Sequence, residues 1–242
     1  MTLDRRSFIK VLGSASGLAL AGCAAQGPVG STTEIMPKGA TRRVVVVGGG
    51  FGGAIAAKYV RMLDKSIEVV LIEQNRQFIS CPFSNFYIAG LMNDMSTLTI
   101  GYDKLAANHG IKMVYGVATA IDPAAKKVVT TEGTLTYDRL IVSPGIDFRN
   151  EEIEGYTADS ANTIPHAWKA GPQTILLRKQ LEAMKDGGTV VLTAPLAPFR
   201  CPPGPYERVC VIADWLKQNK VGSRIIVLDA NAGIIVEKEN FS

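Results

Sequence analysis

The sequence is poor in histidine and cysteine and shows no excess of charge of either sign. Its two histidines, His109 and His166, have no neighbouring cysteine or second histidine, so neither indicates a metal site and both are expected to be structural. No C-x-x-C-H motif is present to attach a c-type haem, and no G-x-S-x-G motif indicates a serine hydrolase. Lysine and arginine total 26 against 22 for aspartate and glutamate, without the clustered basic face that nucleic-acid binding requires.

Long hydrophobic runs are absent as well. The stretch VLGSASGLALAG near the amino terminus is too short to span a bilayer but suits the core of a signal peptide. Arg5 and Arg6 precede it, and such a pair is typical of the bacterial route that exports folded proteins; a chance basic pair is the alternative. We therefore expect residues 1–23 to be a twin-arginine signal and the protein to be periplasmic. LAGC is similar to a lipoprotein cleavage box, which makes Cys23 a candidate lipid anchor, and residues 24–41 are expected to be a flexible linker.

The clearest positive signal is RRVVVVGGGFGGAIAAKYVRML, which starts at Arg42. Its four valines predict a strand buried on both faces. Gly48, Gly50 and Gly53 match G-x-G-x-x-G, in which the glycines permit a tight turn, a close approach of pyrophosphate and close helix–strand packing. A second strand, IEVVLIE, ends at Glu73, whose carboxylate is placed to hold a ribose hydroxyl. This order of elements predicts a Rossmann-like dinucleotide-binding domain in an α/β protein.

The kind of dinucleotide is indicated further along the chain. KKVVTTEGTLTYDRLIVSPGID predicts short β segments, then an apolar strand and a turn at Pro144 and Gly145. This arrangement resembles the second FAD motif of flavoproteins with two dinucleotide-binding domains, and Asp138 before the strand fits the same pattern. The resemblance implies that the first domain, residues 42–150, holds FAD.

The second domain, residues 151–242, is expected to be an incomplete Rossmann-like domain. A helical segment with Leu177, Leu181 and Met184 on one face leads to an apolar strand, TVVLTAP, which is expected to be buried. The turn that follows, FRCPPGPYER, has prolines where a nicotinamide domain needs glycines, and proline has no N–H to donate. We therefore expect this domain to lack a nicotinamide site and to carry Cys201 in its place.

Several segments point to one family. GGGFGG, CPFSN, IEGY, HAWKAG, RKQLE and FRCPPGPYER resemble the flavoprotein subunit of flavocytochrome c sulfide dehydrogenase, from about Arg42 to Ser242. The resemblance implies that Cys81 forms a thioether to the 8α-methyl of FAD and that Cys201 belongs to a redox disulfide attacked by hydrosulfide. It also implies that FAD passes electrons to a haem-carrying c-type cytochrome subunit. Glu207, at the start of an expected helix, is a candidate proton acceptor or a group that tunes the local electric field; an acid favoured there by the helix dipole is the alternative.

The chain departs from this family in one respect. The family is nearly twice as long, and its second redox cysteine lies in the part without a counterpart here. Within the chain the other candidate partners for Cys201 are Cys23, Cys81 and Cys210, and Cys210 is expected to be a core residue. We expect the protein to be an FAD-dependent sulfide dehydrogenase. Its flavin should be reduced by sulfide only when the missing part is supplied. The alternatives are an enzyme similar to sulfide:quinone reductase and a truncated, non-catalytic flavin-binding or assembly fragment.

Overall fold

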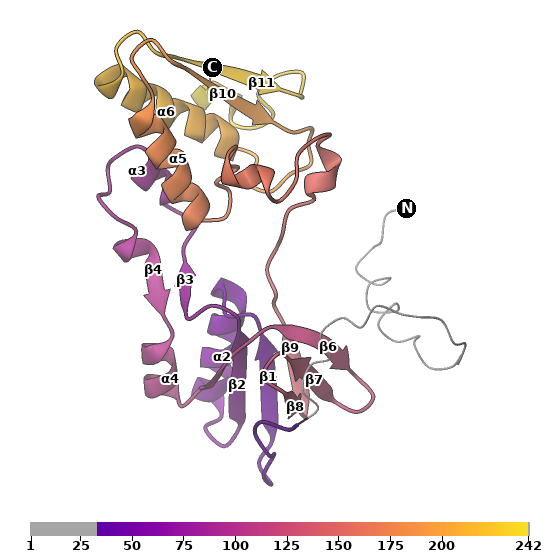
Figure 1. Ribbon diagram of the computed structural model, residues 1–242. Coiled ribbons are helices and arrows are strands. Elements are labelled where there is room, and N and C mark those ends of the chain that lie inside the picture. Colours follow the sequence, from indigo (N-terminus) through magenta and orange to yellow (C-terminus); the bar gives the residue numbers. More distant parts are fainter. Residues whose placement is uncertain (1–32, 242) are drawn as a thin grey trace, which may run out of the picture. The chain divides into compact units, whose positions relative to one another are not determined.

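The computed structural model describes residues 33–241, and these form two compact units (Figure 1). The first unit comprises residues 33–78 and 101–147, and the second comprises residues 79–100 and 148–241. The chain crosses between the units within a two-stranded ribbon and again after the last strand of the first unit. The ribbon consists of β3 (Gln77–Ile79) and β4 (Thr99–Gly101).

The amino-terminal features predicted from the sequence are not covered by this structure. Arg5, Arg6 and Cys23 all lie outside the described residues. Over the part of the chain that is described, no helix is both long enough and apolar enough to cross a membrane.

The end of the expected linker is not a tether. Thr134 donates its N–H to the carbonyl of Thr33 at 2.8 Å, and Ile35 donates its N–H to the carbonyl of Thr134 at 3.1 Å. Ile35 also packs against the hydrophobic core of the first unit. The expectation of a flexible linker is wrong for these residues, because their backbone pairs with a strand and an apolar side chain is covered.

A four-stranded parallel sheet of order β5-β2-β1-β9 forms the centre of the first unit. Its strands are β1 (Arg43–Val47), β2 (Glu68–Glu73), β5 (Lys112–Tyr115) and β9 (Arg139–Val142). All five residues of β1 are buried, which confirms the prediction of a strand covered on both faces. Such burial is expected for the central strand of a parallel sheet.

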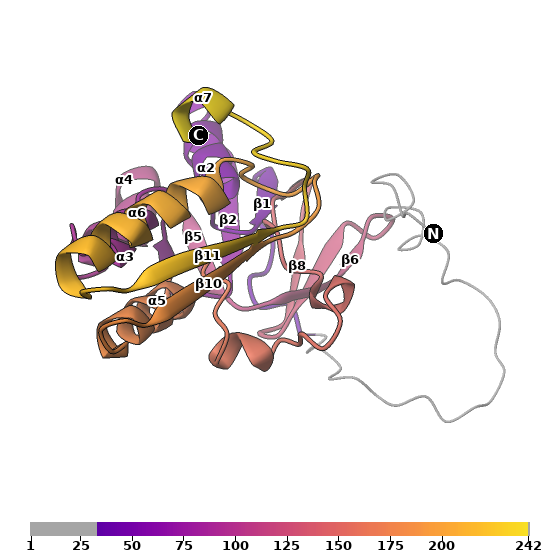
Figure 2. The ribbon, with the colours of Figure 1, turned by 90° about the horizontal axis from the view of Figure 1, so that it is seen from above.

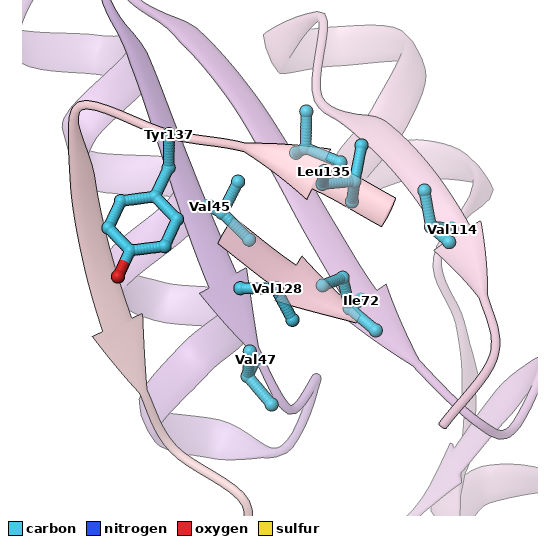
Figure 3. Packing of buried hydrophobic residues seen from close by; sticks show 8 residues of the cluster. Val45, Val47, Ile72, Val114, Val128, Leu135 and Tyr137 are labelled. Carbon is cyan, nitrogen blue, oxygen red and sulfur yellow. The ribbon is translucent and has the colours of Figure 1, made fainter. Parts of the chain in front are cut away.

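Alternation along β1 sends its valines to two different cores. Val44 and Val46 pack with residues of α2 (Phe51–Leu63) and α4 (Asp103–His109) on one face. Val45 and Val47 point to the other face, where they meet the antiparallel sheet β6-β7-β8 (Figure 3). Its strands are β6 (Ala118–Asp122), β7 (Lys127–Thr130) and β8 (Thr134–Thr136). The sheet is therefore sandwiched between helices and a β-meander.

An ion pair between a buried arginine and a partly buried glutamate joins β1 to β2. Arg43 is fully buried, and its guanidinium binds the carboxylate of Glu68, which Lys112 also contacts. Burial alone would raise the pKa of Glu68, but the hydrogen bonds from Arg43 and Lys112 outweigh burial and hold that pKa below its ordinary value. The stability that the pair contributes is therefore present above the ordinary glutamate pKa and is lost as the pH falls through the lowered one.

A Glu68→Gln variant is expected to lower the free energy of unfolding by about 2 kcal/mol at neutral pH, because it removes the charged acceptor of the buried Arg43 guanidinium and leaves it only the Glu34 carboxylate at 3.9 Å. Urea denaturation at neutral and acidic pH would measure this loss, and the difference from the wild type should shrink in acid. Glu152→Gln is the control, since it breaks an exposed pair with Arg149 at 2.7 Å and should have little effect. Equal losses in the two variants would contradict the prediction.

The second unit combines a parallel strand pair with helices. The strands are β10 (Thr189–Ala194) and β11 (Arg224–Asp229), joined by α6 (Gly204–Asn219), which lies along them (Figure 2). The other α-helices are α3 (Ser84–Ile88), α5 (Pro172–Ala183) and α7 (Lys238–Phe241). Short 3₁₀ turns are η1 (Ser96–Leu98), η2 (Asn150–Glu152) and η3 (Ser160–Asn162). The expected helical stripe of Leu177, Leu181 and Met184 is confirmed, since all three join the core formed by α3, α5 and α6.

Two expectations about burial in this unit are wrong. Strand β10 is covered on one face only: Val190 packs towards the helices, whereas Val191 on the opposite face is 57% exposed. Cys210 is exposed rather than in the core. The buried face of α6 passes through Arg208 and Ile212, and Cys210 lies about 200° around the helix from either residue.

Candidate functional site

The predicted glycine loop lies at the carboxyl edge of the parallel sheet. Strands β1, β2 and β9 run in register, so they end together. Gly48 follows β1, Ser143 follows β9, and Glu73 is the last residue of β2. These three residues therefore meet at one edge of the sheet. Strand β1 lies between β2 and β9, so the loop at its end has a neighbouring strand on each side. This is where open α/β sheets bind their ligands.

Two of the glycines have no room for a side chain. Gly48 has φ +95°, and a Cβ there would overlap the carbonyl oxygen of Ser143. A Cβ on Gly53 would overlap the carbonyl oxygen of Gly48. Gly50 differs, because an added Cβ would meet only the ring of Phe78, at 3.6 Å. Gly48 and Gly53 thus hold the loop against the sheet, whereas Gly50 leaves space for a ligand to approach the backbone.

The middle of the loop is fixed by two side chains. Gly49 donates its N–H to Oε2 of Glu73 at 2.7 Å, and the hydroxyl of Tyr102 donates to the carbonyl of Gly49 at 3.0 Å. Burial, aided by the charge of Glu73, raises the pKa of Tyr102, so this hydroxyl keeps its proton. Tyr102 does not belong to the glycine motif. The only sequence signal for Tyr102 was that it is an aromatic residue directly before a helix.

The helix that follows the loop is ready to bind an anion. Gly50 is the N-cap of α2, and among residues 33–241 no side chain caps the first turn. The N–H groups of that turn have no partners within the helix, so they can face a pyrophosphate. Gly145 has φ +84° with no atom within 4 Å of an added Cβ, and Pro144 lies next to Gly48. The geometry fits a dinucleotide such as FAD, and it brings together the predicted residues Gly48, Gly50, Gly53, Glu73, Pro144 and Gly145.

The remaining predicted site residues, Cys81, Cys201 and Glu207, belong to the second unit. Cys81 is half-buried, and its Sγ donates to the carbonyl of Trp168 at 3.5 Å. Cys201 is exposed and has φ +59°, in a turn just ahead of α6. Glu207 lies in the first turn of α6 and is exposed. Both cysteines are free thiols.

A buried arginine lies in the same unit as these cysteines, and no motif in the sequence indicates it. Arg208 is 3% exposed, and its guanidinium lies 3.6 Å from the centre of the Trp168 ring. Burial lowers the pKa of Arg208 to about 10. The charges of Cys81, Glu207 and Cys201 act in the opposite direction and raise that pKa, but by less. The side chain is therefore a cation at neutral pH. Its signal in the sequence was its place on the apolar stripe of α6.

Comparison with known proteins agrees with this geometry. The fold and the glycine loop define a Rossmann-like, FAD-binding flavoprotein of the disulfide-reductase type. The family described as pyridine nucleotide-disulphide oxidoreductase matches residues 42–178, more than half of the sequence, and the chain belongs to this family. The family described as "Sulfide dehydrogenase [flavocytochrome c] flavoprotein chain, central" matches residues 174–242. The resemblance to the sulfide dehydrogenase flavoprotein is confirmed.

Individual relatives support the same grouping. The chain is 67% identical over 45 residues to the sulfide dehydrogenase [flavocytochrome c] flavoprotein chain of Chlorobaculum thiosulfatiphilum, covering 19% of this chain and 94% of that one. It is 20% identical over 188 residues to the mitochondrial sulfide:quinone oxidoreductase of Dictyostelium discoideum, covering 76% and 40% of the two chains. The structure of the sulfide:quinone oxidoreductase of Aquifex aeolicus matches with a TM-score of 0.64 at 22% identity, covering 77% of this chain and 43% of that one. The chain thus spans less than half the length of these two oxidoreductases.

Proposed function

We propose that the chain is the flavoprotein part of a sulfide dehydrogenase, in which sulfide is oxidised at Cys201 and FAD passes the electrons to a c-type cytochrome subunit. The observation that carries this proposal is the loop between β10 and α6. It holds Cys201 at the position where a nucleotide-binding domain has its glycine turn. The loop also falls within the segment that the sulfide dehydrogenase family matches.

The same loop argues against a nicotinamide donor. The turn from β1 to α2 has three residues, 48–50, whereas that from β10 to α6 has nine, 195–203. Four of the nine are prolines, Pro195, Pro198, Pro202 and Pro203. Proline has no N–H, so the backbone offers a pyrophosphate few donors. A small donor that reacts with a thiol suits this loop better than a dinucleotide.

In the proposed reaction, Cys201 is one sulfur of a disulfide whose second cysteine belongs to the complete protein. Hydrosulfide attacks the disulfide, so the S–S bond breaks and a new S–S bond forms a persulfide on one cysteine. The other cysteine leaves as a thiolate that carries the electron pair. Glu207, exposed in the first turn of α6, is the proposed acceptor for the proton of the persulfide. Bound FAD would supply the two-electron acceptor.

The proposal includes a thioether between Cys81 and FAD and a periplasmic location. A covalent link would prevent loss of the cofactor where the cell cannot replace it. Support for the link comes from the CPFSN segment that contains Cys81. Support for export by the twin-arginine route comes from Arg5 and Arg6, and Cys23 remains a candidate lipid anchor.

The test is anaerobic reduction of the flavin in the protein purified with its bound partners. Sulfide should bleach the visible flavin absorbance of the wild type, and Cys201→Ser should slow this by about a thousandfold or more, because the reacting sulfur is removed. Cys210→Ser is the matched control, since it removes another exposed thiol from the same unit.

Other outcomes of this experiment distinguish the alternatives. Bleaching by NADH but not by sulfide would contradict the proposal. Reoxidation of the reduced flavin by a short-chain quinone, without reoxidation by cytochrome c, would favour the sulfide:quinone reductase-like function. An absence of bleaching by any donor would favour a non-catalytic flavin-binding protein.

A further inference from the structure

Both units carry an acid and an asparagine, two positions apart, where their second parallel strand ends. In the first unit these are Glu73 and Asn75, after β2. In the second unit they are Asp229 and Asn231, after β11. In each pair the asparagine donates its backbone N–H and its side-chain amide to the same oxygen of the acid. The two pairs therefore have the same local hydrogen-bond pattern.

The two pairs differ in how they reach the loop that follows the first strand of their unit. In the first unit that loop has three residues, and the acid itself accepts the N–H of Gly49. In the second unit the loop between β10 and α6, the cysteine loop (residues 195–203), is longer, and the asparagine reaches it. Asn231 accepts the N–H of Ala197 and donates to the carbonyl of Pro195, both at 3.0 Å. The start of the cysteine loop is thus tied to the end of β11.

Asp229 connects the other end of the cysteine loop to the same point. Its Oδ1 accepts both donors of Asn231, at 2.9 and 2.7 Å. Its Oδ2 accepts the hydroxyl of Tyr206 at 2.8 Å. Tyr206 lies in the first turn of α6, three residues after the loop ends. One carboxylate therefore joins the residue that holds the start of the loop to the helix that follows it.

The protonation states of these side chains suit the contacts. Burial, and then the bond to Asp229, raises the pKa of Tyr206, so its hydroxyl keeps the proton that it donates. The hydrogen bonds from Asn231, together with that from Tyr206, hold the pKa of Asp229 below its ordinary value. The acceptor is therefore a carboxylate at neutral pH, and hydrogen bonds to a charged acceptor are stronger than those between neutral groups. These three residues are the loop-holding group.

Cys201 lies between the two fixed ends, four residues after Ala197 and five before Tyr206. Its carbonyl accepts the N–H of Gly204 at 2.9 Å, which joins it to the first turn of α6. The cysteine has φ +59°, a left-handed conformation. A residue with a side chain keeps this conformation only where the surrounding structure imposes it. Fixed loop ends are such a constraint.

We propose that the loop-holding group positions Cys201 for the proposed reaction, by fixing both ends of the cysteine loop so that the thiol keeps one place and one direction. Its members act through the loop backbone, so they are positioning residues and not catalytic ones. A small displacement of a reacting group costs a large factor in rate. The inference rests on the proposed function in taking Cys201 as the reacting sulfur. It adds that an acid and an asparagine at a strand end, which accompany a nucleotide loop in the first unit, serve a thiol loop in the second.

The first measurement is the rate of flavin reduction by sulfide, over a range of sulfide concentrations, in the protein purified with its bound partners. Asn231→Ala removes the side-chain contacts to Ala197 and Pro195 and so frees the start of the loop. We expect the maximal rate to fall about ten- to a hundredfold, because the sulfur is less often correctly placed. The sulfide concentration that gives half of the maximal rate should stay within about twofold, since Asn231 contacts the loop and not the substrate.

Two conservative variants and a matched control refine this result. Tyr206→Phe keeps the ring and frees only the helix end of the loop, so it should lower the maximal rate about three- to tenfold. Asp229→Asn keeps the shape and neutral hydrogen bonds, so it should stay within about threefold of the wild type. Asn219→Ala is the control, because it removes one asparagine contact, to the carbonyl of Trp215 at 2.9 Å, at the other end of α6. Its maximal rate should equal that of the wild type.

The second measurement needs no sulfide. A nitroxide spin label is attached to the exposed thiol of Cys201 in a Cys210→Ser background, and its electron paramagnetic resonance spectrum is recorded. The spectrum of a labelled sample that also carries Cys201→Ser is subtracted, which removes the signal of the remaining cysteines. The lines should be broad in this background and should narrow when Asn231→Ala is added, because the label then moves with a freer loop. Adding Asn219→Ala should leave them unchanged.

An unchanged spectrum in Asn231→Ala would overturn the proposal, because the loop would be held without the asparagine. A narrowed spectrum with an unchanged maximal rate would overturn it as well, because the position of Cys201 would not matter. Tyr206→Phe provides both tests if circular dichroism shows that Asn231→Ala does not fold. If sulfide does not reduce the wild-type flavin, the proposed function is refuted, and the spin-label spectra alone decide whether the loop-holding group fixes Cys201.

Discussion

Replacing Cys81 with serine is expected to free all of the flavin from the denatured protein, whereas the wild-type polypeptide should keep it. The reason is that the proposed thioether is the only covalent bond in the arrangement, and serine cannot form it. On a denaturing gel, the wild-type band should fluoresce yellow and the variant band should not. Peptide mass spectrometry should find the mass of FAD on the wild-type peptide that contains Cys81.

The folded Cys81→Ser variant should still bind FAD without a covalent bond. The glycine loop and Glu73 belong to the first unit and do not include the substituted residue. Cys210→Ser, which removes an exposed thiol elsewhere in the second unit, should keep its flavin after denaturation. Free flavin released from the denatured wild type would refute the thioether while leaving FAD binding intact.

Gly48→Ala is expected to abolish stable FAD binding and to lower the free energy of unfolding by about 3 kcal/mol or more. Two effects add at this position. The residue has φ +95°, which alanine adopts only with strain, and the new Cβ would overlap the backbone carbonyl of Ser143. Backbone at a sheet edge cannot move aside without breaking the register of β1 and β9. Urea denaturation and titration of the flavin-free protein with FAD would measure the two losses.

Gly155→Ala separates the two effects. Gly155 has φ +76°, a similar left-handed conformation, but no atom lies within 4 Å of an added Cβ. Its substitution should therefore show only the cost of the left-handed conformation, about 1 kcal/mol, and should leave FAD binding unchanged. Equal losses in the two variants would show that the overlap with Ser143 does not matter.

The parts of the fold that were predictable are those with local causes. The valine run, the glycine spacing and the acid at Glu73 lie within about thirty residues of one another, and each imposes its own backbone geometry. The turn at Pro144 and Gly145 was predictable for the same reason. Their meeting at one sheet edge followed from the rule that parallel strands end together, and the register of β1, β2 and β9 agrees with it.

Burial in the second unit was predicted less well. The apolar letters of TVVLTAP indicated a covered strand, but in the structure helices cover only one face of β10 and β11. Whether a face is covered depends on what packs against it, and apolar composition alone does not specify that. Cys210 was misassigned because its apolar neighbours were read as one stripe, whereas the helical period places it away from Arg208 and Ile212.

The sequence by itself determined which residues with reactive or binding groups the chain carries: a glycine-rich dinucleotide loop, an acid at the end of the second strand, and cysteines in Cys-Pro contexts. Only the tertiary structure placed Cys81 and Cys201 in one unit with Arg208 and Trp168. Arg208 and its partner Asn85 are 123 positions apart in the sequence. No sequence motif connects residues this far apart, because their contact arises from the packing of α3 against α6.

Tyr102 was missed for the same reason, since it reaches Gly49 across 53 positions. Local backbone rules encode a loop or a turn, but which distant side chains come to surround it is decided by how the whole unit packs.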